Sequence, residues 1–478
     1  MKFTLTFFFS LLLTPVFAQR VIGWLGAGPV ASKVHGNLHP RIKLDKYDNP
    51  MVVWGDDAGK VWFAKWGGET FSQPVSLGPP ASMVFTSSWA GPDIGAHGDT
   101  VYVVYKEMPE ETGRIYIRHS YDGGLNFSAA EEVDTKGAYI TRFPTVTTDE
   151  TGNPFVTYMK SEKDDASHRY VVTRSTDLGE SFKKDTMGSV QSGFNVCECS
   201  PAAYIASGNA GVLLYRNSFE GLRNIWAGVS NNGGISFNNG QQIDSTNFKP
   251  ETCPASGPGG VIVGDTMYTV FMSGSRDRQF VYMGKLSLSK PSLSVAPLTG
   301  DIANVSTQNF PRIAGIGNAA AAVWTQTSGG NNFVCLSFTD ALNVFGFPAT
   351  YDTVAEGVML NADVAIGGGY IYVVWEDQVT RSVMFRRGVY YKKKVMSENT
   401  SVLINQPAKG QKYFSVVMQN IVSCALIDAT GNPIEMDISY PKNKDVCKVM
   451  IDDMEPGTYS VKIEDKDGRV YSAKLDIQ

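Results

Sequence analysis

The stretch Ser120-Tyr121-Asp122-Gly123-Gly124-Leu125-Asn126-Phe127 occurs three times in this chain in recognisable form. Its two copies are Ser175-Thr176-Asp177-Leu178-Gly179-Glu180-Ser181-Phe182 and Ser230-Asn231-Asn232-Gly233-Gly234-Ile235-Ser236-Phe237. The third position of the motif falls at Asp122, Asp177 and Asn232, so both steps are 55 residues long. Self-similarity at such a period is typical of propellers and other repeat arrays.

A second periodic signal covers more of the chain. Seven short apolar runs each end in an aromatic residue, and these residues are Trp54, Tyr105, Tyr158, Tyr215, Phe271, Trp324 and Trp375. β-Branched and aromatic runs bounded by Gly, Asn and Asp are typical of strands. Their continuous apolar character indicates that both faces are covered, as for an inner strand between neighbouring blades. The sequence therefore predicts seven β units between about residues 39 and 394.

The pattern Ser-x-Asp-x-Gly-x-x-Phe resembles the Asp-box of the sialidase-like β-propellers. In such a turn the Asp carboxylate accepts backbone N–H groups, and Gly supplies a positive φ. The resemblance implies a structural role for Asp122, Asp177 and Asn232 on the face away from the binding site. We expect an all-β, sialidase-like propeller with seven blades. Six blades, the usual number in sialidases, are the alternative.

The seventh unit stops after its third expected strand, which spans residues 382–391. The apolar run Val21–Leu25 lies at the other end of the expected propeller. We expect this run to supply the missing fourth strand, because closing the ring leaves few exposed sheet edges.

Three segments are expected along the chain. Residues 1–18 read as a signal peptide, with Lys2, an apolar run and small residues before Gln19. Residues 19–394 form the propeller. Residues 395–478 lose the repeat period and predict a small immunoglobulin-like β-sandwich.

The C-terminal segment carries the run Gly457-Thr458-Tyr459-Ser460-Val461 and a closing strand, Ala473-Lys474-Leu475-Asp476. These residues resemble the type A sorting domain of the type IX secretion system. The opening departs from that family, which favours Pro-Asn-Pro where this chain has Asn405-Gln406-Pro407-Ala408. The resemblance implies the type IX secretion machinery as a partner. An ordinary accessory sandwich is the alternative.

Composition limits the classes of function. The 478 residues have a formal net charge of −5 and no basic stripe, so we expect no nucleic-acid partner. No segment has 18 consecutive apolar residues, so no transmembrane segment is expected. With the signal peptide, this predicts a protein that is secreted or held at the outer cell surface.

The chain has six cysteines, and disulfides persist in exported proteins. Cys197, Cys199 and Cys253 form one group, and Cys253 is expected to pair with Cys197 or Cys199. Cys424 and Cys447 form a second candidate pair. Cys335 is expected to be a buried thiol. Cys-x-Cys is not the usual zinc spacing, so no metal site is expected.

Candidate site residues come from the places that border the channel of a propeller. Ligand-binding candidates at the starts of strands and in the loops after the aromatic strands are Arg41, Arg142, Arg216, Arg312, Trp54 and Trp375. Arg forks hold carboxylates at two points, and aromatic faces stack on sugar rings or pack between blades. The candidates for catalysis are Asp93, Glu376 and Tyr391. Sialidases use three Arg, a Tyr nucleophile with a Glu, and an Asp, but the Phe/Tyr-Arg-Ile-Pro motif of that family is absent here.

These observations predict a sialidase-like propeller that recognises a glycan or glycoconjugate. They leave open whether the protein is an enzyme; an exo-acting glycoside hydrolase of the sialidase type is the first alternative, and a structural or adhesive surface protein is the second. No cofactor is expected, although Asp-rich turns such as Gly55-Asp56-Asp57 contain ligands suited to a structural calcium ion.

Overall fold

The computed structural model describes the propeller over residues 22–390, with gaps at 32–35, 135–138, 163–166, 276–277, 291, 301–304 and 368. It describes the C-terminal segment over residues 403–477, with gaps at 408–409, 418–420, 429–431, 435, 437, 440–445, 453 and 466–469. The expected signal peptide, Tyr391 and the expected junction at residue 394 lie outside the described residues.

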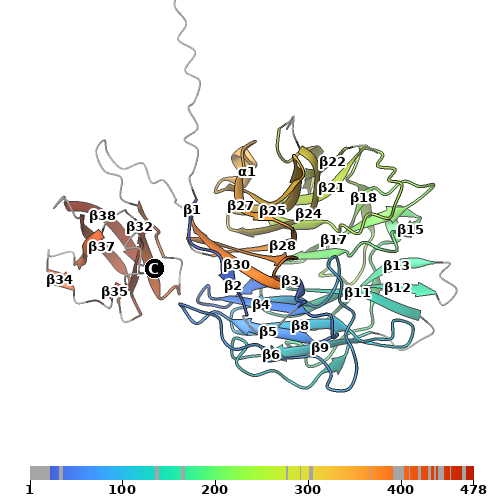
Figure 1. Cartoon of the computed structure of the whole chain (residues 1–478), viewed down its shortest axis with the longest axis horizontal. Helices are drawn as coiled ribbons and strands as arrows, with labels where there is room; N and C mark the ends of the chain where they lie inside the picture. Colours follow the sequence, from blue (N-terminus) through green and yellow to red (C-terminus); the bar gives the residue numbers. More distant parts are fainter. Residues whose placement is uncertain are drawn as a thin grey trace, which may run out of the picture.

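Within these residues, seven antiparallel four-stranded units follow one another as the blades of a propeller (Figure 1). The innermost strands are β3 (Leu38–Leu44), β7 (Asp93–His97), β11 (Tyr139–Thr148), β16 (Ala203–Ser207), β20 (Gly259–Val263), β24 (Val305–Ile316) and β28 (Met359–Ile366). Each innermost strand contacts the next in this order, and β28 contacts β3, so the ring is closed. The prediction of an all-β propeller with seven blades is confirmed.

The second strands contain the seven aromatic runs, and each pairs with the innermost strand of its blade. They are β4 (Pro50–Gly55), β8 (Thr100–Lys106), β12 (Pro154–Glu162), β17 (Ala210–Ser218), β21 (Thr266–Ser275), β25 (Ala319–Ser328) and β29 (Tyr370–Asp377). All seven terminal aromatic residues of these runs are buried. Continuous apolar sequence thus marks the strands that neighbouring blades cover on both faces.

Two further strands complete each blade. The third strands are β5 (Val61–Lys65), β9 (Ile115–Ser120), β13 (His168–Arg174), β18 (Ile225–Ser230), β22 (Arg278–Ser287), β26 (Asn331–Thr339) and β30 (Ser382–Val389). The outer strands of blades 1 to 6 are β6 (Val75–Ser76), β10 (Glu131–Glu132), β14 (Thr186–Met187), β19 (Asn239–Gln242), β23 (Leu293–Pro297) and β27 (Asp352–Gly357). A short strand β15 (Asn195–Val196), a 3-10 turn η1 (Val190–Ser192) and a helix α1 (Leu342–Phe345) occur in connections.

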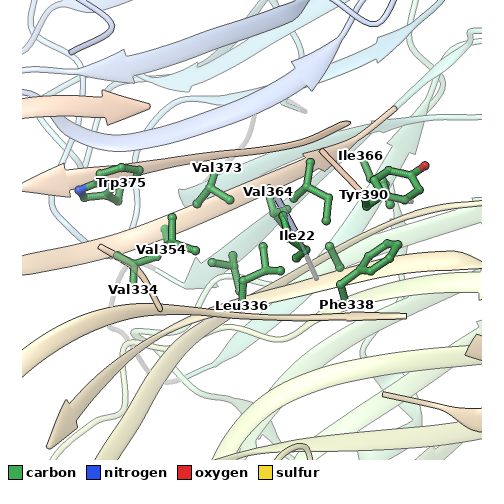
Figure 2. Packing of buried hydrophobic residues seen from close by; sticks show 14 of the residues in the cluster. Ile22, Val334, Leu336, Phe338, Val354, Val364, Ile366, Val373, Trp375 and Tyr390 are labelled. Atoms are coloured by element: carbon green, nitrogen blue, oxygen red, sulfur yellow. The ribbon is translucent and has the colours of Figure 1, made fainter. Parts of the chain in front are cut away.

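The N-terminal segment closes the seventh blade. Strand β1 (Gly23–Trp24) pairs antiparallel with β30 and brings Gly23 opposite Val389; a second piece, β2 (Gly28–Pro29), pairs further along β30. Figure 2 shows Ile22 among Val364, Val373 and Leu336, between the sheets of blades 6 and 7. The described residues therefore confirm the predicted closure.

The three repeated turns adopt one hydrogen-bond pattern. In the first turn the Ser120 hydroxyl donates to Asp122 at 2.7 Å, and Asp122 Oδ1 accepts the N–H of Asn126 at 2.9 Å. Equivalent bonds surround Asp177 and Asn232. Each turn follows a third strand, so strand direction places it at the end of the blade opposite to the start of the innermost strand.

The C-terminal segment forms a separate two-sheet sandwich. One sheet contains β31 (Leu403–Ile404), β32 (Tyr413–Val417), β36 (Val446–Met450) and β35 (Ile438–Ser439). The other contains β34 (Pro433–Ile434), β33 (Ile421–Ile427), β37 (Gly457–Asp465) and β38 (Val470–Ile477). The sheets share one apolar core, which agrees with the predicted sandwich fold.

The sandwich contacts the propeller beside blades 1 and 7. Val417 and Val446 pack in one cluster with Tyr370 and Tyr372 of β29. The Tyr413 hydroxyl donates to the carbonyl of Tyr47, in the turn between β3 and β4, at 3.3 Å. Among the described helical segments, none combines the length and the apolar character needed to cross a membrane.

Candidate functional site

One position repeats around the inner ring. In each blade, one residue of the innermost strand lies opposite the residue just before the terminal aromatic of the second strand. These seven residues, here called the ring residues, are Arg41, Asp93, Thr145, Ala203, Gly259, Arg312 and Asp363. Four adjacent blades, from blade 6 through blade 7 to blades 1 and 2, thus supply Arg, Asp, Arg and Asp. The other three blades supply small residues.

A local irregularity precedes the ring residue in four blades. The strand register shifts there, and His39, Phe143, Phe310 and Asn361 adopt positive φ values of 57°, 53°, 51° and 42°. A β-bulge redirects the side chain that follows it, and Pro, which lacks an N–H, follows in three of the four. Left-handed backbone at residues other than glycine costs energy and clusters at functional sites.

A cavity of about 170 Å³ lies at the centre of this ring. Its lining includes Arg41, Asp93, Arg312 and Asp363, together with Lys43. On the opposite side the lining consists largely of small residues from blades 3 to 5: Thr145, Ala202, Ala203, Gly259 and Gly260. One wall of the channel is therefore charged, and the facing wall leaves space for a ligand.

The two ring carboxylates brace neighbouring blades. Asp363 Oδ2 accepts the N–H of Ile42 at 3.0 Å, from blade 7 to blade 1. Asp93 Oδ2 accepts the N–H of Val146 at 2.9 Å, from blade 2 to blade 3. Burial raises the pKa of Asp93, although Arg41 and the Val146 N–H act in the opposite direction.

Glu376, a candidate for catalysis, is buried and surrounded by donors. Its Oε1 accepts the N–H of His39 at 2.6 Å and the amide of Asn361 at 3.1 Å. Its Oε2 accepts the Ser88 hydroxyl at 3.1 Å and the amide of Gln378 at 2.8 Å. Burial raises the pKa of Glu376 to about 7, although these hydrogen bonds and Arg41 favour the charged form. The carboxyl group ties blade 7 to blade 1 and is absent from the cavity lining.

The two ring guanidinium groups have different surroundings. Arg41 is buried, donates to the carbonyl of Pro40 at 2.8 Å, and lies 3.4 Å from His39 Nδ1. Burial, and then the nearby Arg312, lower the pKa of Arg41 to about 10. Burial and both arginines lower the pKa of His39 well below its usual value, so its imidazole is neutral.

Arg312 is only partly buried, and its guanidinium has no hydrogen-bond or ion-pair partner among the described residues. Lys43, two residues after Arg41 on the same face of β3, is exposed and also lines the cavity. The channel mouth therefore carries an unpaired guanidinium beside a second one.

The remaining sequence candidates lie outside the cavity lining. Arg142 pairs with Glu110, and the fully buried Arg216 donates to the carbonyls of Arg223, Ser256 and Met272. Trp54 and Trp375 are buried in hydrophobic clusters, so they pack between blades and are not exposed to stack on a sugar ring.

Arg41, Arg312 and Asp93, which the sequence predicts as site residues, come together at the cavity. Lys43, Thr145 and Ser88 are not among the residues that the sequence predicts. Strand alternation from Arg41 would have indicated Lys43. Nothing local in the sequence indicates Ser88, because its contact with Glu376 joins residues 288 positions apart.

The cysteines lie away from the ring residues. A disulfide joins Cys199 to Cys253, and the buried Sγ of Cys197 lies 3.3 Å from Cys253 Sγ. Cys424 and Cys447 are buried in the sandwich core as thiols, and their side chains form a hydrogen bond. Cys335 is a buried thiol, as expected.

No protein-family model and no curated protein sequence matches this chain. Solved structures with a related arrangement include a protein of unknown function from Dyadobacter fermentans, which is 11% identical, with a TM-score of 0.45, 66% of this chain covered and 98% of that chain covered. The GH93 α-L-arabinofuranosidase of Fusarium graminearum is 15% identical, with a TM-score of 0.42 and coverages of 65% and 96%. An intramolecular trans-sialidase from Ruminococcus gnavus is 10% identical, with a TM-score of 0.44 and coverages of 65% and 93%. The propeller assignment rests on the strand pairing described above.

Proposed function

We propose that this protein recognises an acidic glycan at the mouth of the central channel, where Arg312 and Arg41 bind a sugar carboxylate. The strongest support is the environment of the Arg312 guanidinium. This guanidinium lines a cavity of about 170 Å³ and makes no direct hydrogen bond or ion pair with the described residues.

Electrostatics favours an anionic ligand here. Two guanidinium groups in one partly buried site repel each other, and this repulsion contributes to the lowered pKa of Arg41. The two ring carboxylates, which also accept backbone N–H groups, offset this repulsion only in part, because Lys43 adds a third positive charge to the lining. A ligand carboxylate would relieve the repulsion, and a planar guanidinium can bind it through two parallel hydrogen bonds.

A glycoside hydrolase activity is the second candidate, and Asp93 supports it. Its carboxyl group lines the cavity, and burial raises its pKa, as is typical of a general acid in such enzymes. Tyr391, another candidate for catalysis, lies outside the described residues. An apolar channel would support the alternative of a structural or adhesive protein. The channel of this protein has a charged wall, which does not support that alternative.

The test is a glycan array that pairs carboxylated glycans with neutral glycans of the same backbone, run beside a fluorogenic sialoside assay. We expect the wild-type protein to bind carboxylated glycans, Arg312→Ala to lose at least tenfold in affinity, and Arg312→Lys to lose less. Lys290→Ala, which removes one exposed charge on blade 5, is the control and should behave as wild type. Equal binding to carboxylated and neutral partners would exclude the proposed function.

We further propose that the protein is exported through its N-terminal signal and that the C-terminal sandwich directs passage to the cell surface by the type IX secretion machinery. The resemblance of residues 457–461 and 473–476 to the sorting domain supports this.

A further inference from the structure

We propose that a second depression on the channel-mouth face binds a further anionic sugar of the same glycan, so that the ligand is an acidic oligosaccharide rather than a single acidic sugar. This inference rests on the proposed function. The depression has a volume of about 510 Å³. Its lining comes from the segment after β19 and from the β21–β22 hairpin: Thr246, Asn247, Lys249, Gly274, Arg278, Phe280 and Tyr282.

Strand direction places this depression on the same face as the channel mouth. Strand β20 starts at the ring residue Gly259, which lies opposite Val270 of the antiparallel strand β21. Strand β21 then continues past the ring to Ser275. At about 3.3 Å per residue, Gly274 lies roughly 13 Å beyond the ring level. A ligand that leaves the cavity along blade 5 would therefore meet the depression.

The depression is basic. The ammonium of Lys249 is exposed and has no hydrogen-bond or ion-pair partner among the described residues. The guanidinium of Arg278 lies over the ring of Phe280, 4.9 Å from its centre, and donates to the carbonyl of Val305 at 3.3 Å. The described lining contains no carboxylate. The ammonium of Lys249, which has no partner among the described residues, favours a carboxylate or a sulfate in this open site, and Arg278 contributes to the same lining.

Aromatic side chains supply a wall for a sugar ring. Phe280 and Tyr282 lie on the same face of β22, and both are only partly buried. Tyr282 stacks on the buried Phe271, with ring centres 6.0 Å apart and planes at 16°. Cations next to flat apolar faces match a sugar that has an apolar ring face and a charged substituent.

The two walls of the depression are tied together. The hydroxyl groups of Thr246 and Ser273 form a hydrogen bond of 2.7 Å. The backbone N–H of Thr246 donates to Asp244 at 2.9 Å. Ser273 in turn donates to the other oxygen of the buried Asp244. Both Asp244 oxygens thus accept hydrogen bonds from the two walls, and this buried carboxylate is absent from the described lining. The loop that carries Lys249 is thus held against the hairpin that carries Arg278.

The test compares ligand length. Galacturonate monomer and hexamer, and sulfated galactan oligosaccharides of matched lengths, are titrated by calorimetry against the whole protein. We expect the wild-type protein to bind the uronate hexamer at least tenfold more tightly than the monomer. Lys249→Ala with Arg278→Ala should remove this advantage and leave monomer affinity unchanged. Lys285→Ala with Lys290→Ala removes two exposed charges from the far end of the same blade and is the matched control.

Each outcome is decisive. If the Lys249/Arg278 variant keeps the full length advantage, or if no probe prefers greater length, the depression is not a subsite. If the variant loses hexamer binding while Arg312→Ala retains it, the depression stands and the proposed channel site fails. If only the sulfated series shows the length advantage, the anion in the depression is a sulfate. If the wild-type protein binds none of these probes, the proposed subsite is overturned, and the glycan array decides the channel site separately.

Discussion

At the scale of residues, the channel depends on where four bulges direct the side chains that follow them. His39 and Phe310 each precede a Pro and then an arginine, and the positive φ of each turns that arginine toward the channel. Arg142 lies before the bulge of its strand. Its side chain pairs with Glu110 and does not line the cavity. The arginines that follow a bulge therefore line the channel, whereas the arginine that precedes one forms an ion pair outside it.

Glu376 leads to a pH prediction. Burial raises its pKa to about 7, above the value of about 4.5 expected for the unfolded chain. The folded state keeps this proton where the unfolded state releases it, so the free energy of unfolding should fall as pH rises from about 4.5 to about 7. The expected fall is up to about 3 kcal/mol.

Chemical denaturation of wild type and of Glu376→Gln across this pH range checks the prediction. The variant cannot titrate at this position, so its free energy of unfolding should change less with pH. Glu69→Gln, at an exposed carboxylate, should keep the wild-type slope. A Glu376→Gln slope equal to that of wild type would show that this carboxyl group does not titrate as described.

At the scale of elements, the repeated turns and the aromatic strands were predictable because their physics is local. A Ser, an Asp and a Gly within five residues suffice to close the Ser120–Phe127 turn. The run 101–105 is apolar throughout because blades cover it on both sides. The short outer strands, such as β6 and β10, have no such pattern, since they are exposed and only two residues long.

Asp122→Ala should lower the free energy of unfolding by about 1–2 kcal/mol, because four donors in the turn lose their acceptor. Burial alone would raise the pKa of Asp122, but hydrogen bonds from Asn126, Ser120 and Leu125 lower it to about 2. Its contribution should therefore be complete above pH of about 4 and vanish as pH falls through about 2.

Thermal unfolding at neutral pH measures this loss of stability, with Glu69→Ala as the control. Glycan binding by Asp122→Ala below its melting temperature should stay unchanged. Lost binding at an unchanged melting temperature would place the turn in the functional site, against its position at the opposite end of the blade.

At the scale of the whole molecule, ring closure brings together what the sequence separates. Arg41 and Arg312 are 271 positions apart, and no local pattern states that blades 1 and 6 present them to one cavity. The number of blades and the closing strand could be predicted from the repeat period. The charged wall and the facing wall of small residues could not be predicted, because they depend on the order of the ring residues around the closed propeller.

Deleting residues 395–478 should leave the propeller folded and trap it in the periplasm. The propeller has its own clusters of buried residues, and the sandwich has a separate core. The deletion uncovers Tyr370 and Tyr372, which pack with Val417 and Val446, so reduced solubility is also expected. Protease accessibility on intact cells is the measurement, and deleted protein at the surface would leave the sandwich as an accessory domain.

A double-mutant cycle across the site can test whether Arg312 binds a ligand carboxylate. Calorimetry would measure wild type and Arg312→Ala with an acidic glycan and with the same glycan after reduction of its carboxylates to alcohols. We expect Arg312→Ala to weaken binding of the acidic glycan at least tenfold and to leave binding of the reduced glycan unchanged. Equal losses for both ligands, or no loss for either, would contradict this expectation.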